Sequence, residues 1–338
     1  MQIPIGTDFV KRPIAALLIA HLAAVTLLMP SRAIGQQAGD YPNKPIRFII
    51  PQTPGAASDV LARILAPRLG DALGQPIVVD NRAGAGGILG ADLAAKSLPD
   101  GYVVLLGASA WITIAPHTYK KLPYDPLTDL VPVSMYALSQ NMLAVHPSLP
   151  ANSVKELIEM MKAKPDALNM ASAGVGSASH LAGLLFTSLA GVSAVHVPYK
   201  GAGQSVVAVI AGEAQWTFTP MQGPLPHVRA GKLRALAVGG TTRSAILPDV
   251  PTAAEGGLPD YYSASWYGIM VPKGTPSPVI DKLNAAMHAA LASQEFKDQI
   301  VFQGAEPKAS TPAAFGRLVQ DEFTRAGKVV KLAGVKVE

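Results

Sequence analysis

Short apolar runs alternate with helical patterns from Tyr41 onward, and this alternation limits the folds that the chain can adopt. The run Ile46–Ile50 is rich in β-branched and aromatic residues, which is typical of a strand. A helical pattern begins at Ser58, and further strands are expected at Ile77–Val79 and Val103–Leu106. Strand, helix, strand and helix in this order predict a parallel sheet with helices on its faces.

The middle of the chain repeats this pattern. Ser153 and Glu156 form the capping box of a helix that extends to about Ala163. Further strands are expected at 168–171, 195–197, 215–219 and 233–238, and helices at 178–189, 205–211 and 225–230. A chain of 338 residues exceeds the size that one hydrophobic core usually supports. We therefore expect an α/β protein of two domains with a cleft between them.

Composition narrows the classes of function. Hydrophobic residues make up 49% of the chain and charged residues 15%, which describes a globular protein. The formal net charge is +5, but there is no run of basic residues, so we expect no nucleic-acid partner. Because the chain has no cysteine, disulfides, thiolate metal sites and cysteine nucleophiles are excluded. We expect neither a metal nor a cofactor.

The N-terminal segment has the pattern of an export signal. Lys11 and Arg12 precede an apolar run over residues 14–29, and the small residues Ser31 and Ala33 follow at positions −3 and −1 of a cleavage site. This order predicts a secretory signal peptide over residues 1–33, with cleavage after Ala33 or, alternatively, after Gly35. The apolar run is short for an anchor that must cross about 30 Å of hydrocarbon. We therefore expect a periplasmic location.

Two strand-to-helix loops share one design. The first loop, Pro51–Ala57, precedes the helix that begins at Ser58, and the second loop, Ser172–Ser177, precedes the helix that carries His180. Their small residues leave backbone N–H groups uncovered at a helix N-terminus, an arrangement that binds anions. Opposed across a cleft, the two loops could hold the ends of a small dicarboxylate. The alternative is that tight turns require small residues for their geometry.

Three side chains near these loops allow two interpretations each. His180 either orients a ligand carboxylate or bonds to the backbone at its helix start. Asp59 either holds a water of the site or is an acid stabilised by the helix dipole. Trp111 follows the third strand and either forms a pocket wall or belongs to the core.

Two enzyme-like patterns do not fit. The glycines within Arg82–Gly90 have the spacing G-x-G-x-x-x-G and follow the second strand, which does not match a dinucleotide-binding fingerprint. The chain contains no G-x-S-x-G sequence. A secreted hydrolase that uses a serine in one of the two loops, tested by Ser177→Ala, is therefore the weaker alternative to a binding protein.

Eight short motifs occur one after another along the mature chain. They are Tyr41–Ile46, Gly74–Gly87, Pro99–Tyr102, Leu122–Pro126, His180–Gly183, His196–Gly201, Val228–Val238 and Leu247–Thr252. In this order and spacing they resemble the Bug/TctC family, the extracytoplasmic binding proteins of tripartite tricarboxylate transporters. The resemblance implies a two-domain type II periplasmic-binding fold, or Venus flytrap. Domain 1 would comprise residues 41–142 plus 259–338, and domain 2 residues 143–258.

The resemblance also implies how a ligand is held. Backbone and hydroxyl groups of the first loop would bind its carboxylate, often through ordered waters. The ligand-binding residues carried over are Gln52, Gly55, Ala56, Ala57, Ser58, Asp59, Ser109, Ala110, Ser172, Ser177, His180 and Thr219, with no catalytic residue among them. The expected function is periplasmic capture of a di- or tricarboxylate or an aromatic acid by domain closure. A monomer would then deliver the ligand to the membrane permease subunits of the transporter, or alternatively signal to a membrane kinase.

The sequence departs from the family pattern at three of these positions. Gln52 stands where an aromatic residue is usual, and Ala56 where the second glycine of a pair is usual. A methyl group at Ala56 would narrow the approach to the backbone if its φ were positive. Thr219 stands where many members carry aspartate, which can hold an amino group, so an amino-acid ligand is disfavoured.

Overall fold

A computed structural model of the protein describes residues 1–2, 41–332 and 334. Apart from residues 1–2, the predicted export signal and its two cleavage sites fall between residues 3 and 40, outside this range. The chain from Tyr41 onward forms one compact unit. Among its described helices, none combines the length and apolar character that a membrane crossing requires.

The chain builds its elements in three stretches. The first contains β1 (Ile46–Ile50), α2 (Ala57–Leu73), β2 (Ile77–Asn81), the 3-10 turn η1 (Ala85–Gly87), α3 (Ile88–Ala95), β3 (Val103–Ala108), the π-helical turn η2 (Ala110–Ile114), α4 (Ala115–Thr118) and β4 (Leu130–Val145). The second contains α5 (Val154–Ala163), β5 (Asn169–Ser172), α6 (Ala178–Ala190), β6 (Val195–Pro198), α7 (Ala202–Ile210), β7 (Trp216–Pro220), α8 (Leu225–Arg229) and β8 (Arg234–Val238). The third contains β9 (Ala264–Pro272), α9 (Ser277–Ala292), α10 (Gln294–Phe302), β10 (Ala305–Pro307) and α11 (Pro312–Leu332).

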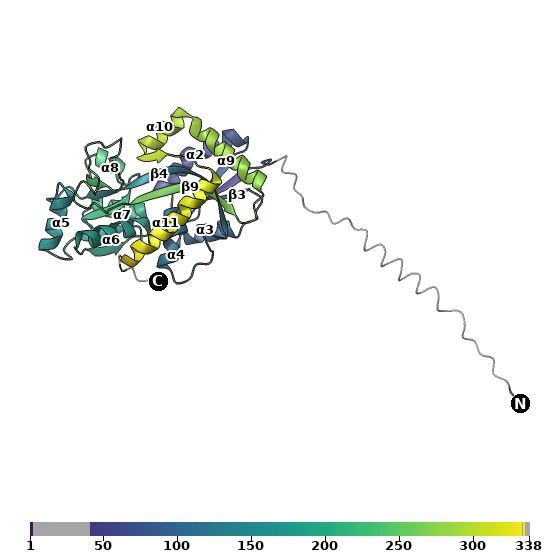
Figure 1. Ribbon diagram of the computed structural model, residues 1–338, viewed down its shortest axis with the longest axis horizontal. Coiled ribbons are helices and arrows are strands. Elements are labelled where there is room, and N and C mark those ends of the chain that lie inside the picture. Colours follow the sequence, from purple (N-terminus) through teal and green to yellow (C-terminus); the bar gives the residue numbers. More distant parts are fainter. Residues whose placement is uncertain (3–40, 333, 335–338) are drawn as a thin grey trace. The chain divides into compact units, whose positions relative to one another are not determined.

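One mixed sheet of ten strands runs through this unit (Figure 1). Its main path has the order β2-β1-β3-β9-β4-β7-β5-β6, and β8 and β10 both pair with β4. Strands β2, β1 and β3 are parallel, as are β7, β5 and β6. The parallel pairing expected from the sequence therefore holds at both ends. In the centre, β9 and β4 run antiparallel to each other and to their neighbours.

The apolar core is divided in the same way as the sheet. One large cluster draws on residues 41–137 and 266–319, and two further clusters draw on residues 142–261. Figure 1 shows α5 to α8 at one end of the unit and α2, α3 and α9 at the other. The long strands β4 and β9 connect the two ends. The predicted boundary after Met142 falls inside β4, and the domain boundaries stay a prediction.

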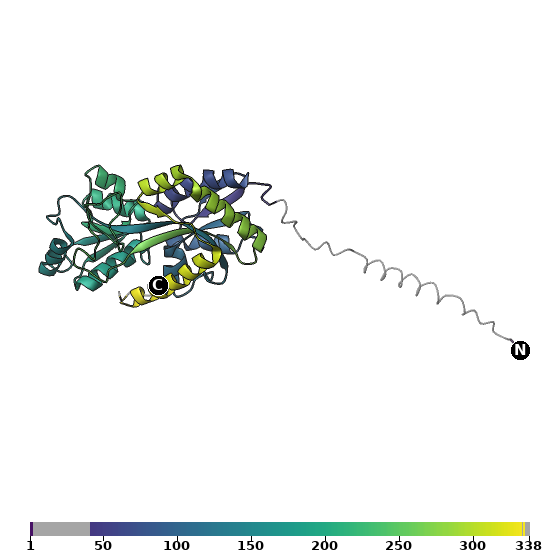
Figure 2. The same ribbon diagram turned by 45° about the horizontal axis from the view of Figure 1, so that its top comes forward.

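The last helix contacts both ends of the unit. Ala326 and Val330 of α11 form a small apolar cluster with Ile114 of η2 and Leu181 of α6. The described chain ends beside this cluster, and Figure 2 shows α11 lying along one side of the sheet. The residues beyond Pro272 thus return mainly to the end formed by β1 to β3, with the tip of α11 reaching α6.

Candidate ligand-binding site

A cavity of about 70 Å³ lies where the first turns of α2 and α6 face the ends of β3, β7 and β9. Eight of the twelve predicted site residues line it: Gln52, Ala56, Ala57, Ser58, Ser109, Ala110, Ser177 and Thr219. Trp111, proposed from the sequence as a pocket wall, lines it as well and is almost fully buried. Its lining side chains, all from the described residues, include no Lys, Arg, His, Asp or Glu. The cavity is therefore uncharged and offers only neutral hydrogen-bonding groups.

Four predicted residues do not line the cavity. Gly55 and Asp59 bond to each other behind the first loop, through the Gly55 amide and a carboxylate oxygen at 2.9 Å. Ser172 is fully buried, and its hydroxyl lies 2.6 Å from Nε2 of His196. His180 is also buried, and its Nδ1 accepts a hydrogen bond from the Gly176 amide at 3.1 Å. The geometry of His180 thus matches the backbone-bonded alternative.

Among the lining residues that sequence reasoning missed are two polar side chains from one strand, Ser265 and Tyr267. Both belong to β9, where they share one face because side chains alternate along a strand. No strand was expected there. The signal was available, since the apolar run that ends at Val271 has the length of a buried strand.

The first turn of α2 presents free donors to the cavity. Its N-cap, Ala56, has φ −69° and ψ 159° and makes no side-chain capping bond. The φ of Ala56 is negative, so the narrowing that was expected for a positive φ does not arise. Within the described chain, the hydroxyl of Ser58 has no hydrogen-bond partner, although the residue is only 3% exposed. Uncapped N–H groups and a free hydroxyl at a helix N-terminus suit an anion.

The first turn of α6 is organised differently. The Ser177 hydroxyl caps the helix by accepting from the His180 amide at 3.2 Å. The Ser179 hydroxyl accepts from the Ala173 amide at 2.9 Å. Both hydroxyls are thus used within the second loop. What this helix offers to a ligand is its remaining first-turn N–H groups beside Ala178.

Two stacked imidazoles hydrogen-bond to the second loop. The rings of His180 and His196 lie 4.0 Å apart between centroids. Burial, followed by the neighbouring His196, lowers the pKa of His180 to about 4, and burial lowers the pKa of His196. Both rings are therefore neutral at pH 7, which allows Nδ1 of His180 to accept a hydrogen bond.

Thr219 contributes a second free hydroxyl. It lies on β7, is fully buried and lines the cavity. Among the described residues, its Oγ1 has no hydrogen-bond partner. Leaving a buried polar group unpaired costs free energy, about 1–3 kcal/mol in proteins. Ser58 and Thr219 therefore give the cavity an unpaired hydroxyl from each end of the sheet, and the buried Ser265 of β9 adds a third.

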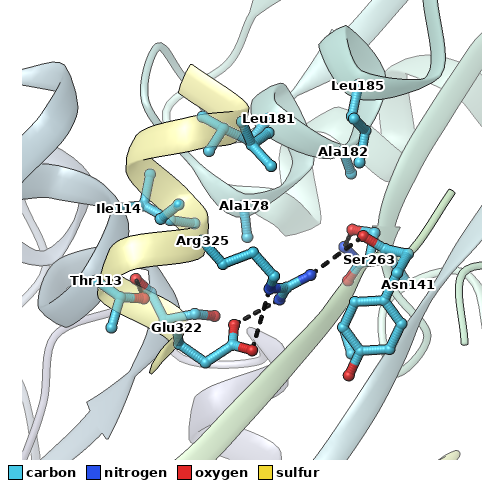
Figure 3. Close-up of a pocket in the computed structure, with 15 residues that line it drawn as sticks. Thr113, Ile114, Asn141, Ala178, Leu181, Ala182, Leu185, Ser263, Glu322 and Arg325 are labelled. Carbon is cyan, nitrogen blue, oxygen red and sulfur yellow. Dashed lines mark hydrogen bonds and ion pairs between the residues drawn. The ribbon is translucent and has the colours of Figure 1, made fainter. Parts of the chain in front are cut away.

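A smaller cavity of about 50 Å³ adjoins the first and shares Ser109 and Ala178 with it. Figure 3 shows its walls, which come from α6, α11 and the strands near Asn141. The one cation among its described lining residues, Arg325, is paired with Glu322 and also stacks on the Tyr262 ring. Because this charge is already neutralised, the larger cavity is the better candidate for an anion.

Two other chemistries were considered from the sequence, a metal site and a serine hydrolase. The described residues contain no group of three or more His, Asp or Glu side chains placed to hold a metal ion. Ser177 bonds to the Ser179 hydroxyl and to the backbone amide of His180, not to a histidine ring. Ser172 does contact His196, but it does not line either cavity described above.

Comparison with known proteins provides evidence that is independent of the cavity geometry. The family whose sequence model matches residues 61–335 is described as tripartite tricarboxylate transporter family receptor. Protein BugT of Bordetella pertussis (strain Tohama I) is 39% identical over 320 residues, covering 94% of this chain and 98% of BugT.

Two solved structures share the fold. An R. palustris protein determined with adipate superposes with a TM-score of 0.85 at 36% identity, covering 87% of this chain and 99% of that one. MatC from Rhodopseudomonas palustris, with bound malate, superposes with a TM-score of 0.81 at 32% identity, covering 86% of this chain and 100% of MatC. These likenesses confirm the two-domain type II binding-protein fold.

Proposed function

Because this chain belongs to the tripartite tricarboxylate transporter receptor family, whose members bind solutes, we propose that it captures a small carboxylate in the cavity between α2 and α6. The observation that carries the proposal is a set of three buried, unpaired hydroxyls around an uncharged cavity: Ser58 of α2, Thr219 of β7 and Ser265 of β9. Relatives of known structure with adipate and with malate support the carboxylate class.

Neutral donors are sufficient to bind such a ligand. The end of a helix stabilises an anion by about 0.3–1 kcal/mol, and by up to about 2 kcal/mol where it is partly buried. A hydrogen bond to a charged group contributes about 1.5–3 kcal/mol. Several such bonds, less the cost of ordering the ligand, reach the roughly −8 kcal/mol of micromolar binding. A lining without fixed cations or anions fits a carboxylate held at helix ends and disfavours a ligand with an amino group.

The proposal also covers export of the protein, its oligomeric state, domain closure and delivery of the ligand. The protein is exported to the periplasm by its N-terminal signal, acts as a monomer without catalysis, and closes its two domains on the ligand. It then delivers the ligand to the membrane permease subunits of a tripartite transporter. Uptake of the labelled ligand by cells with and without the gene tests this delivery, and equal uptake in both would contradict it.

The binding claim is tested by calorimetric titration of the exported, purified protein. Adipate, malate, citrate and benzoate form the panel, and glutamate serves as the amino-acid comparison. We expect micromolar affinity for at least one carboxylate and weaker binding of glutamate. A panel that gives neither heat nor a shift in melting temperature contradicts the carboxylate claim.

Substitutions at two of the three free hydroxyls locate the site. We expect Ser58→Ala and Thr219→Val each to weaken binding of the preferred acid about tenfold, which corresponds to about 1.4 kcal/mol. Thr324→Val is the matched control, because this exposed hydroxyl of α11 bonds only to its own helix backbone. Equal affinities in all three variants would place the ligand elsewhere.

A further inference from the structure

A buried carboxylate lies directly behind the first turn of α2, on the side of the first loop away from the cavity. Asp59 is 2% exposed, and one of its oxygens accepts from the Gly55 amide at 2.9 Å. Its other oxygen accepts from Nδ2 of Asn81 at 2.9 Å. Nε of Arg63 donates to both oxygens at 3.0 Å. None of these four residues lines the cavity.

Asn81 completes the network and fixes the other end of the loop. Its Nδ2 also donates to the Gln52 carbonyl at 3.0 Å, and its Oδ1 accepts from Nη2 of Arg63 at 3.0 Å. Gln52 and Gly55 are therefore both held by side chains, one from β2 and one from α2. Between them, Gly55 has φ +80°, a conformation that favours glycine. The network thus determines where the loop that faces the cavity lies.

The network also determines the charge state of Asp59, next to the proposed site. Burial by itself raises the pKa of Asp59, but hydrogen bonds from Arg63, the Gly55 amide and Asn81 outweigh burial and lower it. Asp59 is therefore ionised at neutral pH. It follows Ser58 directly in the chain, so its charge lies at the helix end that would bind a ligand carboxylate. An uncompensated charge there would repel the ligand, because like charges at this range interact through partly desolvated protein.

We propose that Arg63 and Asn81 are positioning residues of the carboxylate site: Arg63 neutralises Asp59 so that the end of α2 stays attractive to an anion, and Asn81 fixes the loop that presents its N–H groups. This inference rests on the proposed function. Neither residue touches the ligand, since both act from behind the loop. The ligand class that depends on them is a small organic anion.

Because Arg63 is exposed, the effect of its removal on ligand binding can be separated from an effect on the stability of the fold. The side chain of Arg63 is 53% exposed, and ion pairs at that exposure stabilise a fold little. Arg82 provides a matched control, because its side chain is 52% exposed and pairs with Asp80 at 2.9 Å, outside the cavity lining. Removing either arginine changes the net charge of the protein equally.

The first test is titration of the full exported protein with adipate at low and high salt. We expect Arg63→Met to weaken binding about tenfold at low salt, with a smaller effect at 0.5 M salt because ions screen the repulsion. Arg63→Lys, which keeps the charge, should remain within about threefold of the wild type. Arg82→Met should leave the affinity unchanged. Equal losses for Arg63→Met and Arg82→Met, or no loss for Arg63→Met, overturn the role of Arg63.

The second test needs no ligand and so separates this inference from the proposed function. In the ligand-free protein, we expect Asn81→Ala to speed hydrogen exchange of the Gly55 amide at least tenfold, because the Asp59 acceptor loses its support. Exchange in α6 should not change. Unaltered exchange at Gly55 overturns the role of Asn81. A wild type that binds no carboxylate overturns the proposed function instead.

Discussion

The two strand-to-helix loops look alike in the sequence but hold their helix ends in different ways. The first loop is supported from behind by charged groups, Asp59 and Arg63, and leaves the Ser58 hydroxyl unpaired. The second is supported by two neutral histidines, its Ser177 hydroxyl caps α6, and the Ser179 hydroxyl of α6 accepts from the Ala173 amide. Small residues before a helix therefore show where donors could be exposed. They do not show which donors the loop itself already uses.

Acid should affect the two loops in separate pH ranges, and this is the largest effect that we expect. The pKa of His180 is lowered from 6.5 to about 4, so the unfolded chain takes up a proton first as the pH falls. Stability should then fall between pH 6.5 and pH 4, by about 3 kcal/mol for this group. The pKa of Asp59 is also lowered, so its contribution is lost only below about pH 4. Urea unfolding at a series of pH values measures both.

His180→Asn separates the two ranges. An asparagine Oδ1 can accept the Gly176 amide in place of the ring nitrogen, but it does not titrate. We expect the variant to lose most of the slope above pH 4 and to keep the slope below it. Part of the upper slope should remain, because burial lowers the pKa of His196 as well. An unchanged slope above pH 4 would show that the second loop is not the acid-sensitive one.

The glycines of the two loops provide the next test of the comparison. Gly55 has φ +80° with no atom within 4 Å of an added Cβ, whereas Gly176 has φ +72° and an added Cβ would lie 2.7 Å from Thr118 Oγ1. Gly55→Ala should cost about 1–2 kcal/mol of stability from backbone strain alone. Gly176→Ala should cost about 2–3 kcal/mol, since it adds a steric clash between the second loop and α4. Thermal or urea unfolding measures the difference.

A second substitution can remove the clash with Thr118 while leaving the backbone strain at position 176. In Gly176→Ala/Thr118→Ala, we expect the additional loss to disappear and the cost to fall to that of Gly55→Ala. Adipate affinity should follow the same order, because the contact joins the second loop to α4, which belongs to the first stretch of the chain. If both single variants lose the same stability, the contact with Thr118 does not distinguish the loops.

The sequence predicted the ends of the sheet better than its centre. The expected strands at Ile46–Ile50 and Ile77–Val79 and the capped helix after Ser153 are all present, because short-range periodicity and caps determine them. Both loops were identified for the same reason. Eight of the expected site residues line one cavity, although whether they bind a ligand stays a prediction.

The centre of the sheet depends on long-range contacts, which local sequence patterns do not predict. Strand β4 spans Leu130–Val145 and pairs with β9, β7, β8 and β10 in turn, so its two ends face different cores and its pattern is irregular. Ser265 and Tyr267 enter the cavity only because β9 lies beside β4. The support of Asp59 by Asn81 likewise joins residues 22 positions apart, on a helix and a neighbouring strand. None of these follows from spacing along the chain.

The smallest effect tests whether an uncapped helix end is what distinguishes the first loop. Ala56 has the extended backbone of an N-cap but no side-chain acceptor, whereas Ser177 caps α6. Ala56→Ser adds an acceptor for a first-turn N–H of α2, so we expect a gain of about 0.5–1 kcal/mol in stability and, because the ligand competes for that N–H, about threefold weaker binding of adipate. Ser177→Ala should lower stability by about 1 kcal/mol with a smaller change in affinity. Stability by urea unfolding and affinity by titration should thus move in opposite directions at Ala56. A variant that gains stability and keeps its affinity would show that the end of α2 does not bind the ligand.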